Sequence, residues 1–514
     1  MGSSRQRHAA SLTGQTMSAT DHQTVSSAIL LTMQAFDDLQ GRLGEALAAN
    51  QAGSGVDHVL IALPSFSVGE SLLSHYVERI PALEHRYLLA MLMLYRIELC
   101  EFVFISCSAP DPDVVEYYLS LLPADQRESA RRRLRMLEVP DRTGRAVAAK
   151  LLDRPDLMDE LRTWIGGRPA VIEPWNVQAD EVALAEYLEV PMNGTSPALW
   201  RLGFKSAGRR LFAEAGVPSP AGTEGVRSID DVVNAVTAIR LARPAAAGVV
   251  VKLDDSGAGD GNIVIDLREP DALRRALDGL PDWYVTDLAA GGVVEELIGG
   301  SPLTSPSVQI DMLPDGSVRV LATHEQVLGG GTGQVYMGCR FPADAEYAPQ
   351  LATYARAVGE LLAQRGARGR AGLDFVAARS PGNTWDLFAL EINLRKGGTT
   401  HPYAVLRNLV PGHYDPQRGE WITAKDGTTR AYCSTDNLVD PSWLGLAPTT
   451  AMDAVAEAGL RFDIDRGTGV VLHMLAGLAI DGRVGLTSIG HDADHAGELY
   501  EAAATAIANA AASP

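Results

Sequence analysis

Two strand-like runs on either side of residue 380 restrict the fold of this chain more than any other segment. GLDFVAAR at 372–379 and TWDLFALEINLR at 384–395 are separated by Ser-Pro-Gly-Asn, a strong turn sequence. They predict an antiparallel hairpin that brings Asp374 within a residue or two of Glu391. The chain is therefore expected to contain an antiparallel sheet that carries two carboxylates close together.

One face of this hairpin has the composition of a metal site. Side chains alternate between the two faces of a strand, so one set is expected to point into a core, namely Phe388, Leu390, Ile392 and Leu394. The other face then carries Glu391, Asn393 and Arg395, together with Asp374 across the hairpin. Two carboxylates and an amide oxygen suit Mg²⁺ that also binds nucleotide phosphates, whereas zinc prefers histidine or cysteine. The alternative is a solvated polar face of an edge hairpin.

A glycine-rich loop is the second chemical feature. VKLDDSGAGDGNIVIDL at 251–267 places Lys252 on an apolar run ahead of Gly257, Gly259 and Gly261. Dinucleotide folds and P-loops lead from such a loop into a helix, but here another strand-like run follows, which excludes both. We interpret the segment as a hairpin whose glycine tip covers a triphosphate, with Lys252 as a charge for phosphate oxygens. The alternative is a plain surface turn.

The remaining pattern predicts a chain in three parts. Up to about residue 195, short apolar runs alternate with helical patterns, which predicts a parallel α/β sheet; the runs are HVLIAL at 58–63, EFVFIS at 101–106 and PAVIEPW at 169–175. The turn PSFSVGESLLSHY after the first run is either a ligand position or only a strand-to-helix connection. Residues 196–410 are rich in glycine and hairpin signals, including Pro-Asp-Gly at 314–316. Residues 411–514 hold two β-rich pieces, VVLHMLAGLAI and GRVGLTSIG, before an alanine-rich helix.

Composition excludes several classes of function. The formal net charge of −20 argues against nucleic acid or an anionic membrane as a partner, because both require a basic surface. Four scattered cysteines indicate thiols of a reducing cytoplasm rather than disulfides or a zinc site, so a cytoplasmic location is expected. The most apolar window, YLLAMLMLY at 87–95, is too short to span a bilayer. The first twenty residues are polar and predicted to be disordered.

In their order along the chain, the motifs resemble those of the ATP-grasp superfamily of carboxylate–amine ligases. The resemblance extends over roughly 200 residues. It is carried by Lys205 in LGFKSAGRRLFAEAGVPSP, Lys252 before the glycine loop, VVEELIGG at 293–300, Asp374 in GLDFV, and EINLRKGG at 391–398.

The resemblance implies a role for each of these residues. Lys205 and Lys252 contact ATP phosphates, which the loop from Gly257 to Gly261 covers. VVEELI holds adenine, with Glu295 or Glu296 accepting the exocyclic amine and backbone near Glu296 and Ile298 completing the edge. Asp374, Glu391 and Asn393 hold Mg²⁺, and Arg395 stabilises charge on the transferred phosphoryl group. Family members often carry a ribose-binding acid just after the hinge; GGSPLTSPS stands there in this chain, so no ribose ligand is assigned.

Taken whole, the chain most resembles the pheganomycin-type peptide ligases of actinomycete natural-product pathways. The resemblance implies an α/β protein with a tail over 1–20, a parallel α/β pre-ATP-grasp domain over 21–195, an ATP-grasp domain over 196–410 with a flap at about 217–295, and a small α/β C-terminal domain over 411–514. It implies that ATP and Mg²⁺ serve to join the carboxylate of an unusual amino acid to the amine of a peptide or amino acid. Another ATP-grasp enzyme, such as a carboxylate–thiol ligase or a phosphotransferase, and a non-catalytic ATP sensor are the alternatives. The oligomeric state stays open, with a homodimer among the alternatives.

Ligation of this kind proceeds through an acyl phosphate that an amine attacks. The first step requires charge neutralisation. The second requires a stabilised oxyanion, for which Arg395 and Arg370 are candidates; Arg370 is alternatively a solvated loop charge. A lid that excludes water protects an acyl phosphate, and the glycines at 257–261 and 329–333 suit that purpose. Candidate substrate contacts are Glu325, Gln326 and His401, although His401 is alternatively a structural hydrogen-bonding group.

Overall fold

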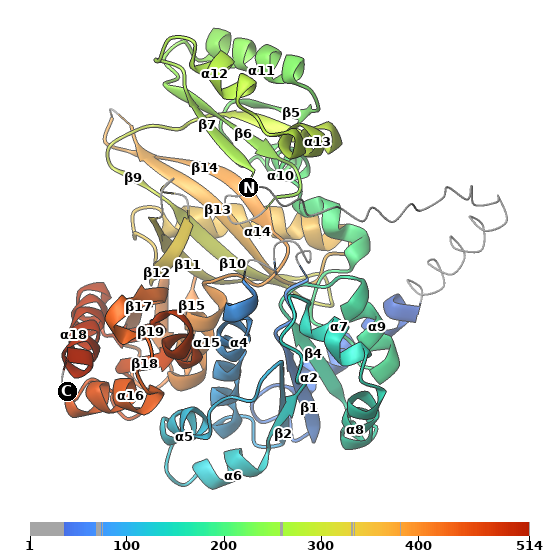
Figure 1. The fold of residues 1–514 in the computed structure, drawn as a ribbon, viewed down its shortest axis with the longest axis vertical. Helices are drawn as coiled ribbons and strands as arrows, with labels where there is room; N and C mark the ends of the chain where they lie inside the picture. Colours follow the sequence, from blue (N-terminus) through green and yellow to red (C-terminus); the bar gives the residue numbers. More distant parts are fainter. Residues whose placement is uncertain are drawn as a thin grey trace, which may run out of the picture.

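A computed structural model describes residues 35–67, 73, 76–256, 261–329, 333, 335–380 and 382–512. Three sheets organise this part of the chain: a parallel four-stranded sheet, an antiparallel four-stranded sheet and a sheet of eleven strands. In Figure 1 the small antiparallel sheet and its helices form an upper lobe above the large sheet. The N-terminal and C-terminal segments lie side by side below it. This mixed architecture confirms the predicted α/β fold class.

The N-terminal sheet is parallel, as the alternating pattern predicted, with the strand order β3-β2-β1-β4. Its strands are β1 (His58–Leu63), β2 (Cys100–Ser106), β3 (Leu134–Glu138) and β4 (Ala170–Pro174). Every residue of β1 is buried, which explains its continuous apolar run, because helices cover both faces of such a sheet. Successive connections run to one side of β1 and then return to the other, so the strand order reverses between β1 and β4. In open α/β sheets, ligands bind at this reversal point, beyond the carboxyl ends of the strands.

Helices surround the N-terminal sheet. They are α2 (Leu43–Ala49), η1 (Val77–Arg79), α4 (Ile80–His85), η2 (Arg86–Tyr95), α5 (Pro112–Ser120), α6 (Arg127–Arg132), α7 (Val147–Leu152), α8 (Pro155–Ile165) and α9 (Ala179–Leu188). The apolar window YLLAMLMLY forms the buried 3-10 helix η2.

The upper lobe contains the predicted lysine-bearing hairpin. Its sheet has the order β5-β8-β6-β7, built from β5 (Gly222–Val226), β6 (Gly248–Leu253), β7 (Asn262–Asp266) and β8 (Gly292–Glu296). Strands β6 and β7 pair antiparallel with Lys252 opposite Asn262, which confirms the hairpin. The Tyr284 hydroxyl donates to the carbonyl of Gly261 at 3.0 Å and so holds the end of the loop. Gly257 and Gly259 lie outside the described residues.

Three helices pack on this lobe: α11 (Ile229–Ala242), α12 (Ala272–Asp278) and α13 (Asp282–Ala290). Ser228 caps the N-terminus of α11, because its hydroxyl accepts the backbone N–H of Asp231 at 3.1 Å.

The large sheet lies directly beneath this lobe (Figure 1). Its main path runs β14-β13-β10-β11-β12-β17-β16-β15. The strands are β9 (Leu303–Thr304), β10 (Pro306–Met312), β11 (Val318–Gly329), β12 (Val335–Phe341), β13 (Gly369–Arg379), β14 (Trp385–Asn393), β15 (Gly412–Asp415), β16 (Glu420–Thr423), β17 (Thr429–Val439), β18 (Gly469–His473) and β19 (Arg483–Gly490). Both predicted hairpins, β10–β11 and β13–β14, are present. Helix α14 (Ala348–Gln364) packs on β10 and β11, whereas α10 (Lys205–Glu214), preceded by η3 (Pro197–Gly203), packs on β14.

A β-bulge corrects the predicted alternation along β14. The pairing shifts after Asp374, which faces Glu391, so that Phe375 faces Ala389 and Leu390 is the extra residue. The core side before the bulge therefore consists of Leu387 and Ala389, not of Phe388 and Leu390 as predicted. Ile392 and Leu394 beyond the bulge are buried, as predicted. A bulge reverses the faces because one inserted residue displaces a period of two.

The C-terminal segment continues the large sheet. Strand β17 pairs with β12 on one side and with β19 on the other. The segment VVLHMLAGLAI is a strand only over β18, and then turns into η5 (Leu475–Gly477) and α17 (Leu478–Asp481). The other helices of this part are α15 (Thr400–Leu409), η4 (Pro441–Trp443), α16 (Pro448–Glu457) and α18 (Ala493–Ala512), the last being the predicted alanine-rich helix.

Two expectations from composition can be compared with the structure. The four cysteines are buried and free, as predicted. Within the described ranges, no helix combines the length and apolarity needed to cross a membrane.

An aromatic cluster fixes the junction between β11, β12 and β17. His324 is fully buried, and its Nε2 lies 2.6 Å from the Tyr432 hydroxyl. Phe341 stacks on Tyr432 with ring centroids 4.9 Å apart. Burial lowers the pKa of His324 to about 3, because the charged imidazolium has no solvent there.

Acidification is expected to destabilise the protein through His324. The pKa of His324 in the folded protein lies below the ordinary value of 6.5. The contribution of His324 to the free energy of unfolding is therefore complete above pH 6.5 and is lost as the pH falls toward 3. Between pH 7 and pH 5 the loss is about 2 kcal/mol. Calorimetric melting at both pH values should show a smaller acid-induced fall for His324→Gln than for the unaltered protein. Exposed His413→Gln should retain the full fall; an equal fall in His324→Gln would contradict the assignment.

Candidate active site

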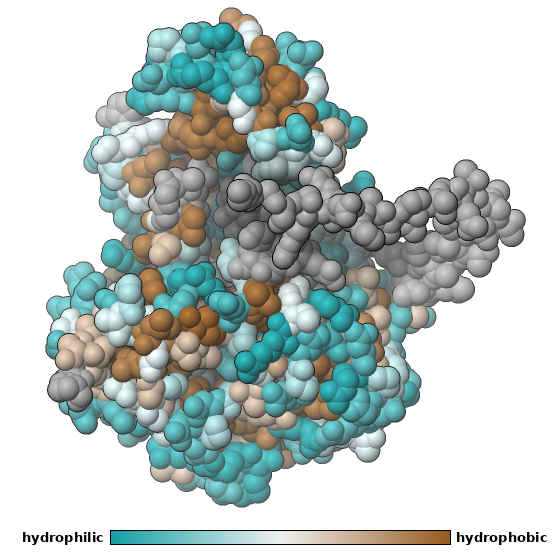
Figure 2. Space-filling model, viewed as in Figure 1, coloured by the Kyte–Doolittle hydropathy of each residue, from teal (hydrophilic) through white to brown (hydrophobic). Residues whose placement is uncertain are grey.

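A cavity of about 900 Å³ lies between the upper lobe and the large sheet. Residues of β6 and β8 line it from above, and residues of β10, β11, β13 and β14 line it from below. Its far end reaches Trp175 and Arg86 of the N-terminal part. Figure 2 shows the molecule narrowing below the lobe, with hydrophobic residues gathered on the lobe above the narrowing.

The predicted carboxylate cluster is assembled on the floor of this cavity. Asp374 and Glu391 face each other directly across β13 and β14. The Asn393 amide donates to Asp374 Oδ2 at 2.9 Å, and the Gln326 amide donates to Oδ1 at 2.6 Å. Gln326, predicted as a substrate contact, is therefore bonded to the carboxylate cluster in this structure.

The pKa values of the two carboxylates are shifted in opposite directions. Burial raises the pKa of Asp374, and the Glu391 carboxylate beside it raises it further. At Glu391 burial acts in the same sense, but the Lys205 ammonium outweighs it and the pKa is lowered. A cation placed between the two would relieve the repulsion that raises the Asp374 pKa.

The cluster has the chemistry of a Mg²⁺ site that shares its metal with a ligand. All donors are oxygens, which Mg²⁺ prefers, and two carboxylates with one amide leave positions for phosphate oxygens and water. No group of three or more His, Cys, Asp or Glu side chains suited to a metal ion occurs in the described ranges. Asp374, Glu391 and Asn393 could hold Mg²⁺ together with oxygens supplied by a ligand.

Lys205 reaches the cluster from the first residue of α10. Its Nζ lies 3.1 Å from Glu391 Oε2 and donates to the carbonyl of Ser256 at 2.7 Å. Ser256 is the last described residue before the glycine loop, so Lys205 connects the base of that loop to the carboxylate cluster.

Lys252 projects from β6 into the same cavity, where it is paired. Its Nζ lies 2.5 Å from Glu295 Oε2, and Arg209 Nη1 lies 2.7 Å from Glu295 Oε1. Glu295 is almost fully buried between these two cations. Its neighbour Glu296 is more open, lines the cavity and faces Arg243 at 3.5 Å. Ile298 follows at the cavity edge.

The two candidate arginines differ in their environments. Arg395 lies with its guanidinium carbon 5.4 Å from the centre of the Trp175 ring and donates to the carbonyl of Lys396 at 3.1 Å. It forms no ion pair with any residue in the described ranges. Arg370 is on β13 and not in a solvated loop; it is bound to Asp311 at 2.5 Å and to Gln309 at 3.1 Å.

The other two predicted substrate contacts, Glu325 and His401, lie in different surroundings. Glu325 lines the cavity and accepts hydrogen bonds from the Tyr347 hydroxyl and the backbone N–H of Asp344. His401 does not reach this cavity; it lines a second cavity of about 900 Å³ behind Thr400. There it stacks edge-on against Tyr87, and burial lowers its pKa well below the ordinary value. Gly330 and Gly331 of the second glycine segment lie outside the described residues.

Sequence patterns did not identify Arg86 and Trp175 as cavity residues. Arg86 begins the apolar helix η2, where its neighbours suggest only a core. Trp175 directly follows β4, and its position at the reversal point of the strand order was the available signal.

The sequence of this chain is similar to those of several known proteins. Residues 450–503 match a family model described as the PGM1 C-terminal domain. The L-propargylglycine–L-glutamate ligase of Streptantibioticus cattleyicolor is 34% identical over 425 residues, which cover 79% of this chain and 85% of that protein. IQ motif-containing protein H of Danio rerio is 23% identical over 360 residues, 58% of this chain and 34% of that protein.

Among solved structures, the ADP complex of N5-carboxyaminoimidazole ribonucleotide synthetase, an ATP-grasp enzyme, shares the fold. The TM-score is 0.50 at 12% identity, over 87% of this chain and 96% of that chain. The extent and identity of the ligase match, together with this fold, place the chain in a family. It belongs to the ATP-grasp family of ATP-dependent carboxylate–amine ligases.

Proposed function

We propose that this protein phosphorylates the carboxylate of one amino acid with ATP and joins it to the amine of a second amino acid or a peptide, releasing ADP and phosphate. The observation that carries the proposal is the cavity in which Asp374 and Glu391 face each other, with Lys205, Lys252 and Arg395 close by. The relative named for joining L-propargylglycine to L-glutamate supports amino acids as the substrate class. The mechanism requires no protein nucleophile.

The nucleotide fits between the lobe and the large sheet in this proposal. Apolar side chains from both sides line that end of the cavity and suit an adenine ring: Val250, Leu297, Val376 and Leu390. Glu295 is occupied by two cations, so Glu296 is the better acceptor for the exocyclic amine, with backbone near Ile298. Lys205 and Lys252 then contact the phosphates. Leu390 reaches this surface because of the bulge in β14.

Asp374, Glu391 and Asn393 would hold Mg²⁺ together with phosphate oxygens. The ion, when bound, withdraws charge from the phosphates and assists transfer of the terminal phosphoryl group. A carboxylate oxygen of the first substrate attacks the γ-phosphorus, ADP leaves, and an acyl phosphate forms. The amine then attacks the carbonyl carbon, phosphate leaves and the nitrogen loses a proton. In this proposal Arg395, which lacks an ion-pair partner among the described residues, stabilises the charge that develops in both steps.

A coupled assay of ADP release tests this function. Mixtures of ATP and Mg²⁺ with L-glutamate, L-propargylglycine and the common L-amino acids, singly and in pairs, should release ADP rapidly only with a productive pair. Mass spectrometry should detect the corresponding dipeptide, because phosphoryl transfer is completed only when an amine consumes the acyl phosphate. ADP release with a single acid and no condensed product would indicate a phosphotransferase. Nucleotide binding without turnover for any pair would indicate a sensor.

Loss of the charged groups in the cavity should abolish turnover without unfolding the chain. Lys252→Ala and Glu391→Gln are each expected to lower kcat by about 100-fold or more, since each removes a charge that acts on the transferred phosphoryl group or its metal. Exposed residues provide matched controls: Lys425→Ala, and Asp386→Asn on the same strand as Glu391, should keep full activity. Retained activity in Glu391→Gln would refute the metal assignment.

The two neighbouring glutamates should have separable effects on the choice of nucleotide. Inosine triphosphate lacks the exocyclic amine, so the unaltered protein should prefer ATP by about 10-fold, the value of a charge-assisted hydrogen bond. Glu296→Gln should reduce this preference. Glu295→Gln should weaken both nucleotides alike, because it loosens Lys252 rather than the adenine contact. A loss of preference in Glu295→Gln alone would reverse the assignment.

A further inference from the structure

The reversal point of the N-terminal sheet opens into the far end of the nucleotide cavity. Phe66 follows β1 and Trp175 follows β4, and their ring centroids are 5.1 Å apart. Trp175 also lines the cavity. Through Trp175, the proposed active site therefore borders the end of the sheet at which open α/β sheets commonly bind ligands.

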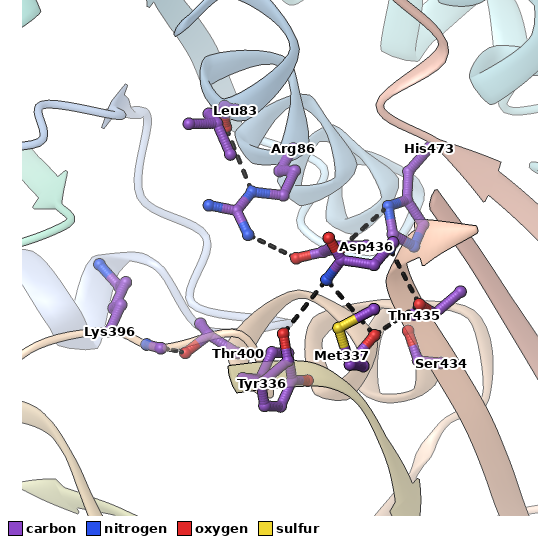
Figure 3. A network of polar contacts seen from close by, with 12 residues as sticks. Leu83, Arg86, Tyr336, Met337, Lys396, Thr400, Ser434, Thr435, Asp436 and His473 are labelled. Carbon is purple, nitrogen blue, oxygen red and sulfur yellow. Dashed lines mark hydrogen bonds and ion pairs between the residues drawn. The ribbon is translucent and has the colours of Figure 1, made fainter. Parts of the chain in front are cut away.

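Arg86 lies over both aromatic rings at this point. Its guanidinium carbon is 5.8 Å from the centre of Phe66 and 5.7 Å from that of Trp175. One terminal nitrogen is bound to Asp436 Oδ2 at 2.5 Å, and Nε donates to the carbonyl of Leu83 at 3.3 Å. Figure 3 shows the second terminal nitrogen pointing away from both partners. Arg86 thus lines the cavity while part of its donor fork has no partner among the described residues.

A second guanidinium shares the same indole. Arg395 lies 5.4 Å from the centre of the Trp175 ring and forms no ion pair in the described ranges, although the carboxylates of Glu391 and Asp374 lie near enough to act on its charge. Arg86 and Arg395 both contact the Trp175 ring, and of the two only Arg86 has an ion-pair partner among the described residues, namely Asp436. Both guanidinium groups therefore keep N–H donors that have no partner in the described ranges.

An indole with two arginines elsewhere in the protein shows the contrasting case. Arg135 and Arg168 each lie 5.4 Å from the centre of Trp164. There Arg135 pairs with Glu160, and Arg168 pairs with both Asp57 and Glu101. Internal carboxylates satisfy that pair, which is a structural contact. At Trp175, Arg395 forms no ion pair within the described ranges, and Glu391 and Asp374 act on its charge only from beyond ion-pair distance. Its donors are therefore open to an external anion.

The C-terminal segment sets the orientation of Arg86. Asp436 lies on β17, and its other carboxylate oxygen is 3.5 Å from His473 Nδ1 on β18. His473 is fully buried, and its Nε2 lies 3.2 Å from the Thr487 hydroxyl on β19. Figure 3 shows this connection from Arg86 to the C-terminal strands. These groups act through Arg86 and are positioning residues.

We infer that Arg86 and Arg395 over Trp175 form a binding site for a carboxylate that the reaction does not consume, namely the α-carboxylate of the amino acid or peptide that supplies the amine. The inference rests on the proposed ligase function. A planar guanidinium fork matches a carboxylate, and an indole accommodates the apolar part of an amino acid. Arg395 follows Asn393 by two residues and borders the phosphoryl-transfer region. Arg86 comes from the opposite wall and forms no ion pair with Asp374 or Glu391, which suits the substrate end that does not react.

Equilibrium binding tests the inference without relying on turnover. L-Glutamate, L-propargylglycine and the other L-amino acids, each paired with its α-carboxamide, would be titrated calorimetrically into the protein with Mg²⁺ and a non-hydrolysable ATP analogue. For the amine substrate, the acid should bind about 10- to 100-fold more tightly than the amide. Arg86→Gln should remove that preference while leaving the affinity for the amide unchanged. Arg168→Gln, at the matched indole, should keep it.

Further variants separate recognition from folding. Arg86→Gln leaves the Asp436 carboxylate buried without its partner, so Arg86→Gln/Asp436→Asn removes both charges and should show the same loss of preference with a normal melting profile. Arg86→Lys should retain part of the preference. The inference is wrong if every ligand keeps its preference in the folded double variant, or if no amino acid binds the unaltered protein. A preserved acid preference with no condensed product in the turnover assay would instead overturn the ligase function and leave the carboxylate site standing.

Discussion

Two carboxylates placed opposite each other on one sheet face, Asp374 and Glu391, are the constraint on which the arrangement of the cavity depends. Like charges that face each other in a partly buried position repel each other, and folding tolerates them only where compensating groups surround them. Lys205 compensates Glu391 directly, while Asn393 and Gln326 donate to Asp374. We propose that the same crowding, which is costly in the free protein, makes the pair a receptor for a cation that carries phosphates.

The charged groups around this pair also connect the upper lobe with the large sheet. Lys205 begins a helix that packs on the large sheet, yet its ammonium also binds the carbonyl of Ser256 at the base of the glycine loop. Lys252 is held by Glu295, which Arg209 holds in turn. Charged groups of the upper lobe and of the large sheet therefore depend on each other, so that any movement of the lobe alters the contacts of the cavity. Beyond them, Trp175 of the N-terminal part meets Arg395 of the large sheet, and Asp436 of the C-terminal segment binds Arg86.

Sequence patterns predicted those features that depend on neighbours along the chain. The β13–β14 hairpin follows from a turn sequence and flanking β-branched and aromatic residues, and the β6–β7 hairpin follows from the run after the glycines. The parallel N-terminal sheet follows from its alternation of strand and helix patterns. The bulge at Leu390 was missed, because the partner strand, not the local sequence, determines where a ladder shifts. The alternation predicted for Phe388 and Leu390 consequently failed.

Sequence patterns could not predict ion pairs between residues that lie far apart along the chain. Nothing near Glu295 in the sequence indicates that Arg209 and Lys252 will enclose it, and nothing near Arg86 indicates an aspartate 350 residues away. By itself, the sequence determined the α/β class, the two hairpins and the acidic pair, because these rest on local periodicity and turn chemistry. It also carried the motifs in the order that resembles ATP-grasp ligases. Only the tertiary structure decided that two cations enclose Glu295 while Glu296 lines the cavity, and that Arg395 forms no ion pair among the described residues. It also decided that Trp175, at the reversal point of the N-terminal sheet, lines the cavity. Those properties arise from charges brought within a few ångströms by packing, an effect that has no counterpart in sequence spacing.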